Sequence, residues 1–106
     1  MELAFATQSL RDLCEQQPLA EQELGIAKAR VLIALVADLK AASTVSDLPS
    51  YVEVVADDRN GTFRSARCCV SAVVAGQHVP LAADGSVEFC SVYRIKIVKV
   101  EDDDDT

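Results

Sequence analysis

The sequence predicts an α+β domain, in which a short strand and a helical hairpin precede a mainly antiparallel sheet. The first observation is a length of 106 residues, half of them apolar and a quarter charged, which is typical of one soluble globular domain. The second is that apolar residues recur every three or four positions in the first half of the chain. The third is that the second half is rich in valine and contains signals for tight turns.

A short strand and a first helix are expected at the beginning of the chain. Leu3 and Phe5 alternate with smaller or polar residues, as in a half-buried strand. Thr7 is a suitable N-cap, and the apolar positions of residues 8–17 fall on one helical stripe. Pro18 ends this helix and is well placed near the start of the next one.

A longer amphipathic helix is expected over residues 19–42. Its apolar positions step by three or four, which predicts one continuous helix of about six turns. These positions are Leu24, Ala27, Val31, Leu35, Leu39 and Ala42. Residues 43–49 are expected to connect this helix to the sheet, because Pro49 blocks a continuation.

The second half of the chain is expected to form the sheet. Residues 51–57 are rich in valine and precede Asn60–Gly61, a dipeptide that is typical of a two-residue hairpin turn. Residues 62–75 are β-prone throughout, so they form either one long bent strand or two strands with an abrupt corner. Residues 76–80 are expected to leave the sheet, and Asp84–Gly85 to form a further turn.

A last strand is expected over residues 92–100. Alternation puts two groups of side chains on opposite faces, with Arg94, Lys96 and Val98 on one and Tyr93, Ile95 and Ile97 on the other. Hairpin connections between the strands make the sheet mainly antiparallel. Both helices are then expected to pack on one face of it.

The net charge of −7 is concentrated at the end of the chain. Residues 1–50 carry four basic and seven acidic side chains, residues 51–100 carry six and five, and the last six residues carry five acids and no base. We therefore expect one domain over residues 1–101 and a solvated acidic tail over residues 102–106. The acidic total argues against bulk electrostatic binding to nucleic acid, but a small local basic patch is compatible with it.

The cysteines and the apolar runs predict a cytoplasmic protein. Cys14, Cys68, Cys69 and Cys90 have neither the spacing of a metal site nor the density of a disulfide scaffold, so we expect reduced, buried thiols and no metal. The N-terminus lacks the basic and apolar regions of a signal peptide. The longest uncharged apolar run, Val31–Ala37, is far too short to span a bilayer, so no contact with a membrane is expected.

Three stretches of the chain, in this order, resemble the RelE/ParE superfamily of toxin–antitoxin toxins, and most of all its HigB-like killer or plasmid-maintenance proteins. They are Leu3–Glu15 with Glu23–Gly25, then Leu39–Ser43 with Val45–Pro49, and finally Val79–Pro80, Ala83–Ser86 and Val92–Asp102. Asp58–Phe63 also matches an Asp-Arg-x-Gly-x-aromatic hairpin of that family. The resemblance covers about two thirds of the chain and implies the RelE/ParE fold.

The match is poorer where the family has its catalytic residues. Ser65–Val70 occupies the place of a strand, a turn and a Tyr-Arg-aliphatic strand, with residues missing. If a gap is allowed, Arg67 supplies the arginine of the family; an ungapped match puts Cys69 there. Relatives often end in a Tyr-His pair after Glu-Asp, where this chain has Asp103 and Asp104.

The resemblance implies a metal-independent endoribonuclease that cuts mRNA on the ribosome without a cofactor. In such toxins the 2′-hydroxyl of the RNA attacks the neighbouring phosphate, and the protein holds the phosphate and stabilises the developing charge. Arginine suits both tasks, because its guanidinium is forked and permanently charged. The candidate catalytic residues are then Arg64, Arg67 and Lys96, and the candidate RNA-binding residues are Arg59 and Arg94.

Proton transfer has two candidates in this chain. His78 is the only histidine, the residue type that titrates near neutrality, although it lies in a predicted loop. Asp104, next to Asp103, stands where the family has its final pair, and crowded carboxylates separate their pKa values. Loss of one proton-transfer group typically lowers a rate by about 10²–10⁴-fold, so a weakened or inactive toxin stays an alternative.

The expected partners are a cognate antitoxin and, for an active toxin, mRNA on the ribosome; a homodimer is a further alternative. Two other functions stay open, namely a non-catalytic module that binds an antitoxin-like protein or itself, and a ParE-like inhibitor of DNA gyrase. Residues 59–67 and 101–105 have opposite charges. This leads to the hypothesis that the tail covers the basic site as an antitoxin segment would.

Overall fold

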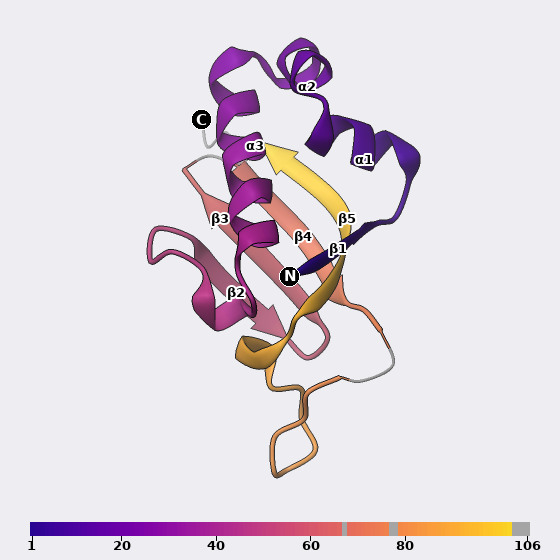
Figure 1. Cartoon of the computed structure of the whole chain (residues 1–106), viewed down its shortest axis with the longest axis vertical. Helices are drawn as coiled ribbons and strands as arrows, with labels where there is room; N and C mark the ends of the chain where they lie inside the picture. Colours follow the sequence, from indigo (N-terminus) through magenta and orange to yellow (C-terminus); the bar gives the residue numbers. More distant parts are fainter. Residues whose placement is uncertain (67, 77–78, 103–106) are drawn as a thin grey trace.

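The sheet of this protein is mixed, because its first strand runs parallel to its last. The computed structural model describes residues 1–66, 68–76 and 79–102. The strands are β1 (Glu2–Phe5), β2 (Glu53–Asp57), β3 (Asn60–Ser65), β4 (Cys68–Val74) and β5 (Arg94–Asp102). They lie in the order β1-β5-β4-β3-β2 (Figure 1), and every pairing except β1–β5 is antiparallel. β5 thus includes the first residue of the predicted acidic tail, Asp102.

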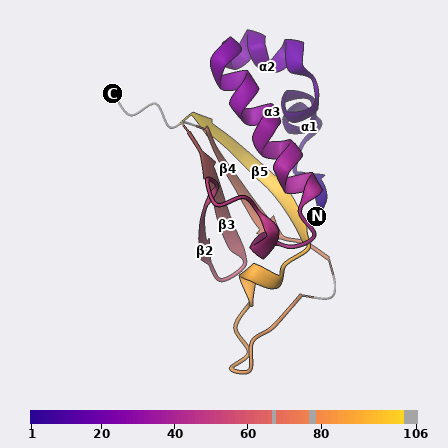
Figure 2. The ribbon, with the colours of Figure 1, turned by 60° about the vertical axis from the view of Figure 1, so that its left-hand side comes forward.

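Three helices cover one face of the sheet (Figure 2), so the α+β class is confirmed. They are α1 (Gln8–Glu15), α2 (Gln17–Leu24) and α3 (Ile26–Ala41). Thr7 caps α1 as predicted, because its Oγ1 accepts a hydrogen bond of 3.1 Å from the amide of Leu10. Pro18 lies in the first turn of α2, where its missing N–H costs nothing.

The prediction of one continuous helix over residues 19–42 is wrong. Gly25 separates α2 from α3, and its φ of 86° lies in the left-handed region that glycine adopts at little cost. The amide of Gly25 still donates to the carbonyl of Glu21, which closes the last turn of α2. The apolar periodicity of the sequence continues through Gly25, so this pattern did not reveal the break between the two helices.

The turn between β2 and β3 comes two residues before the predicted Asn60–Gly61. Asp57 pairs with Asn60, so the loop has two residues, and its first residue, Asp58, has a φ of 55°. Gly61 lies inside β3, where the ring of Phe89 packs so closely that an added Cβ would be 2.1 Å from it. This glycine is needed for packing and not for the turn.

The other predicted elements are present with shifted ends, because the first helix, expected over residues 8–17, ends at Glu15, and the last strand, expected over residues 92–100, is Arg94–Asp102. Of the two alternatives for residues 62–75, the chain forms two strands, and Ala66 at the corner between them has a φ of 51°. Of residues 76–80, the described ones (76, 79 and 80) lie outside the strands, and the predicted turn at Asp84–Gly85 is closed by an amide of Ser86 that donates to Asp84. Short 3-10 helices occur in both connections, η1 (Val45–Asp47) before β2 and η2 (Phe89–Ser91) before β5.

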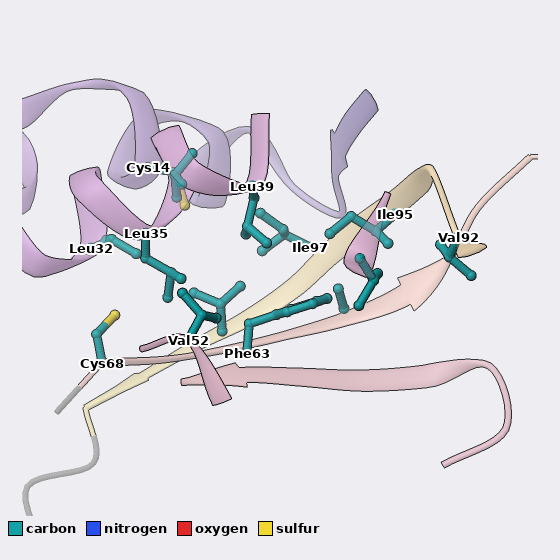
Figure 3. Close-up of a cluster of buried hydrophobic side chains, with 14 of the residues drawn as sticks. Cys14, Leu32, Leu35, Leu39, Val52, Phe63, Cys68, Val92, Ile95 and Ile97 are labelled. Atoms are coloured by element: carbon teal, nitrogen blue, oxygen red, sulfur yellow. The ribbon is translucent and has the colours of Figure 1, made fainter. Parts of the chain in front are cut away.

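The hydrophobic core lies between α3 and the sheet (Figure 3). Leu32, Leu35 and Leu39 of α3 face Phe63, Ile95 and Ile97 of the sheet, and at most 1% of each of these residues is exposed. Cys14 of α1 completes the same cluster. The core thus uses one face of the sheet, and the described helices leave the other face uncovered (Figure 2).

The prediction of buried thiols holds for Cys14, Cys68 and Cys69 and is wrong for Cys90, which is exposed. Burial raises the pKa of Cys14 to about 11, with a smaller contribution from the carboxylate of Glu15. In the part of the chain that the structure describes, no helix has the length and apolar character needed to cross a bilayer.

Candidate nucleic-acid interface

The candidate site is the face of the sheet opposite the helices, which we call the open face. In Figure 2, α1, α2 and α3 all lie on the other side of the sheet. The strand registers place the following residues on it: Glu2 and Ala4 of β1, Arg94, Lys96, Lys99 and Glu101 of β5, Cys69, Ser71 and Val73 of β4, Asn60, Thr62 and Arg64 of β3, and Glu53, Val55 and Asp57 of β2. Most of the predicted cations are therefore on one surface.

Arg64 and Lys96 both lie on the open face, but they are too far apart to form one compact catalytic centre. Arg64 pairs with Cys69 on β4, whereas Lys96 pairs with Val73, whose partner on β3 is Asn60. The two cations are thus four residues apart along the strands and two strands apart across the sheet. At standard strand spacings, this is about 14 Å along and about 10 Å across.

Arg94 lies at the β1 side of the open face and has several neighbours. Its Nε is 2.6 Å from Oε2 of Glu2, and its guanidinium lies 5.8 Å from the centre of the Tyr93 ring. The aliphatic part of the Arg94 side chain lies close to Gly76. A Cβ added to Gly76 would be 3.1 Å from Cδ of Arg94. Together with Glu2, Ala4, Ala75 and Gly76, Arg94 lines an open hollow of about 230 Å³.

Lys99 is a cation of the open face that the alternating pattern missed. Ile97 pairs with Ala72 and Lys99 pairs with Ser71, so Val98 is the extra residue of a β-bulge. The bulge reverses the alternation and turns Lys99 to the open face, where strict alternation predicts Val98. Nζ of Lys99 lies 2.5 Å from a carboxylate oxygen of Glu101, and this hydrogen bond raises the pKa of the lysine.

Arg59 is in the turn between β2 and β3, next to the open face. Its carbonyl accepts a hydrogen bond of 2.8 Å from the amide of Val74, which fixes the turn against β4. This end of the sheet also carries Lys96 and Arg94, because Lys96 pairs with Val73 in the same row as Asn60. The cations are therefore spread along the sheet, with Arg94 and Lys96 at this end, Lys99 in the middle row beside Ser71, and Arg64 toward the other end.

The open face is balanced in charge within the described residues. Its cations are Arg64, Arg94, Lys96 and Lys99, and its carboxylates are Glu2, Glu53, Asp57 and Glu101. Glu53 is the cross-strand partner of Arg64, as Glu2 is of Arg94. A bound polyanion would have to compete with these carboxylates for the cations.

Three predicted site residues, Arg67, His78 and Asp104, lie outside the described residues. The described part of the open face offers guanidinium and ammonium groups, carboxylates, and the hydroxyls of Thr62 and Ser71, whereas Cys69 is buried. The guanidinium and ammonium groups can hold phosphates, and the hydroxyls can donate hydrogen bonds to them. Among the described residues, none on this face is a histidine suited to proton transfer at neutral pH.

Comparison with protein-family models, with curated proteins and with solved structures gives no match.

Proposed function

We propose that the chain is a RelE/ParE-like toxin of a toxin–antitoxin system and that the open face of its sheet binds RNA. The observation that carries this proposal is the common location of Arg64, Arg94 and Lys96, which come from two strands and lie on the sheet face that the described helices leave uncovered. The order of strand, helices and antiparallel strands supports the same family. The RelE/ParE resemblance implies that the RNA is mRNA on the ribosome.

The spacing of the cations favours a track for the RNA backbone over a compact catalytic centre. Arginine and lysine position a strand by its phosphates, without reading its sequence. Cleavage also needs groups that move protons to and from the reacting oxygens. Because Asp103 and Asp104 stand where the family has its Tyr-His pair, we propose slower cleavage than in a toxin that keeps this pair, by the factor of about 10²–10⁴ that one proton-transfer group typically contributes.

Induced expression in a bacterial host tests this function, with growth and transcript cleavage followed together. We expect the unmodified chain to arrest growth and cut transcripts, and the variant Arg64→Ala/Lys96→Ala to do neither. The control Arg30→Ala/Lys40→Ala removes the same charge from exposed positions of α3, so it should act like the unmodified chain. Healthy growth with folded, soluble protein would contradict the toxin proposal. Growth arrest without cut transcripts would contradict RNA cleavage and favour inhibition of DNA gyrase.

A non-catalytic interaction module on the same fold is the second candidate. The observation that favours it is the balance of cations and carboxylates on the open face, since mixed charges suit a protein surface better than a polyanion. This candidate predicts healthy growth, no cut transcripts and a protein partner whose binding is weakened by Lys96→Glu. If Lys96→Glu leaves the affinity for that partner unchanged, the open face is not the binding site.

A further inference from the structure

We propose that the free edge of β2 is a docking site for an extended, basic segment of a partner protein, which adds a strand to the sheet. β2 is the last strand in the order of the sheet, so the described strands cover only one of its two edges. All five of its residues are exposed. An exposed edge strand offers unpaired backbone groups to another chain.

The backbone groups available at this edge follow from the hairpin. Asp57 and Asn60 close a two-residue loop and therefore form a hydrogen-bonded pair. Hydrogen-bonded pairs recur at every second residue, so Val55 also bonds to β3. The N–H and C=O groups of Val54 and Ala56 then point to the free edge, where a partner strand can pair with all four.

The side chains of β2 define the chemistry of the partner. Glu53, Val55 and Asp57 share the open face, and 69% of Val55 is exposed. An antiparallel partner strand would put one residue opposite each of them. Basic residues at its positions i and i+4, with a β-branched residue at i+2, give two opposite-charge pairs around one apolar pair.

The same pattern argues against a second copy of this chain as the partner. Two β2 strands in antiparallel register about Val55 would place Glu53 of each copy opposite Asp57 of the other. Like charges directly opposite each other destabilise a pair of strands. The proposal depends on the edge of β2 and not on the cations of the open face, so it stands or falls independently of RNA binding.

A titration of the isotope-labelled full chain, followed by the amide resonances in NMR, tests the proposal. The probe is a nine-residue peptide with arginine at positions 3 and 7 and valine at position 5, and its matched control has glutamate at positions 3 and 7. We expect the arginine peptide to shift the amides of Val54 and Ala56. It should bind at least about ten-fold more tightly than the glutamate peptide, because two cross-strand pairs change sign.

Two variants separate the charges of β2 from its backbone. Glu53→Lys/Asp57→Lys should reverse the preference between the peptides, whereas Glu21→Lys/Glu23→Lys, an equal change of charge on α2, should preserve it. Val54→Pro removes an N–H from the free edge, where proline is tolerated, so it should abolish the binding of the arginine peptide. The spectra of the free variants show whether each has kept the sheet.

Three results would overturn the proposal. They are equal affinity for both peptides, shifts confined to residues outside β2, and shifts of Val54 and Ala56 that depend on protein concentration without peptide. The last result would identify a second copy as the partner.

Discussion

Gly61 and Phe89 illustrate how one residue of this sheet is determined by a distant one. The Phe89 ring lies against Gly61 so closely that a methyl group at this position has no space. We expect Gly61→Ala to lower the free energy of unfolding by about 1–3 kcal/mol, the usual cost of overpacking, as measured by urea denaturation. The same change in a Phe89→Leu background should cost less. An equal cost in both backgrounds would mean that the ring is not the cause.

Cys14 predicts a dependence of stability on alkaline pH. Its pKa is raised from 9.0 to about 11 in the folded protein, mainly because burial disfavours the thiolate. The folded state thus keeps a proton that the unfolded state releases, so stability is complete below pH 9 and falls as the pH rises toward 11. Urea denaturation across this range should give a shallower decline for Cys14→Ala than for the unmodified chain. Parallel declines would assign the effect to other groups.

At the scale of the elements, the helix ends depend on local chemistry. The hydroxyl of Thr7 accepts the amide of Leu10 and so satisfies one free donor of α1. We expect Thr7→Ala to lower the free energy of unfolding by about 1 kcal/mol, whereas Thr7→Asp should preserve it, because aspartate is an equally good cap. Thermal unfolding of the two variants measures the difference. Equal losses would show that the cap contributes nothing specific.

Local signals predicted the elements well and their junctions less well. Thr7, Pro18 and the valine-rich second half predicted the correct element types, because capping and strand preference act over a few residues. The break at Gly25 was missed because the apolar stripe continues across it. The hairpin turn was predicted two residues late because Gly61 serves a contact with Phe89 that sequence pattern alone does not contain.

The candidate site was predictable in part for the same reason. Arginine and lysine in the strand-rich half could be recognised as candidates, and alternation placed Arg94 and Lys96 on one face. Two other features depend on strand register. They are the bulge at Val98, which brings Lys99 to that face, and the separation of Arg64 from Lys96. Register is determined by tertiary pairing between β3, β4 and β5, so the pattern of one strand does not reveal it.

At the scale of the whole molecule, net charge opposes binding of RNA by the open face. Residues 103–106 contribute three of the carboxylates behind the net charge of −7. We expect a chain that ends at Asp102 to bind single-stranded RNA more tightly than the full chain, and the gain to shrink as salt screens the charges. Fluorescence anisotropy at two salt concentrations measures both effects. Unchanged affinity at low salt would contradict this expectation.

We propose that RNA binds to the open face of the sheet. The most direct test is a titration of the isotope-labelled chain with a single-stranded RNA oligonucleotide at low salt, followed by amide chemical shifts. We expect shifts at Thr62, Ser71 and Val73 and along β5, and a loss of these shifts in Arg64→Ala/Lys96→Ala. Shifts confined to α1, α2 and α3, or no shifts with RNA in excess, would contradict it.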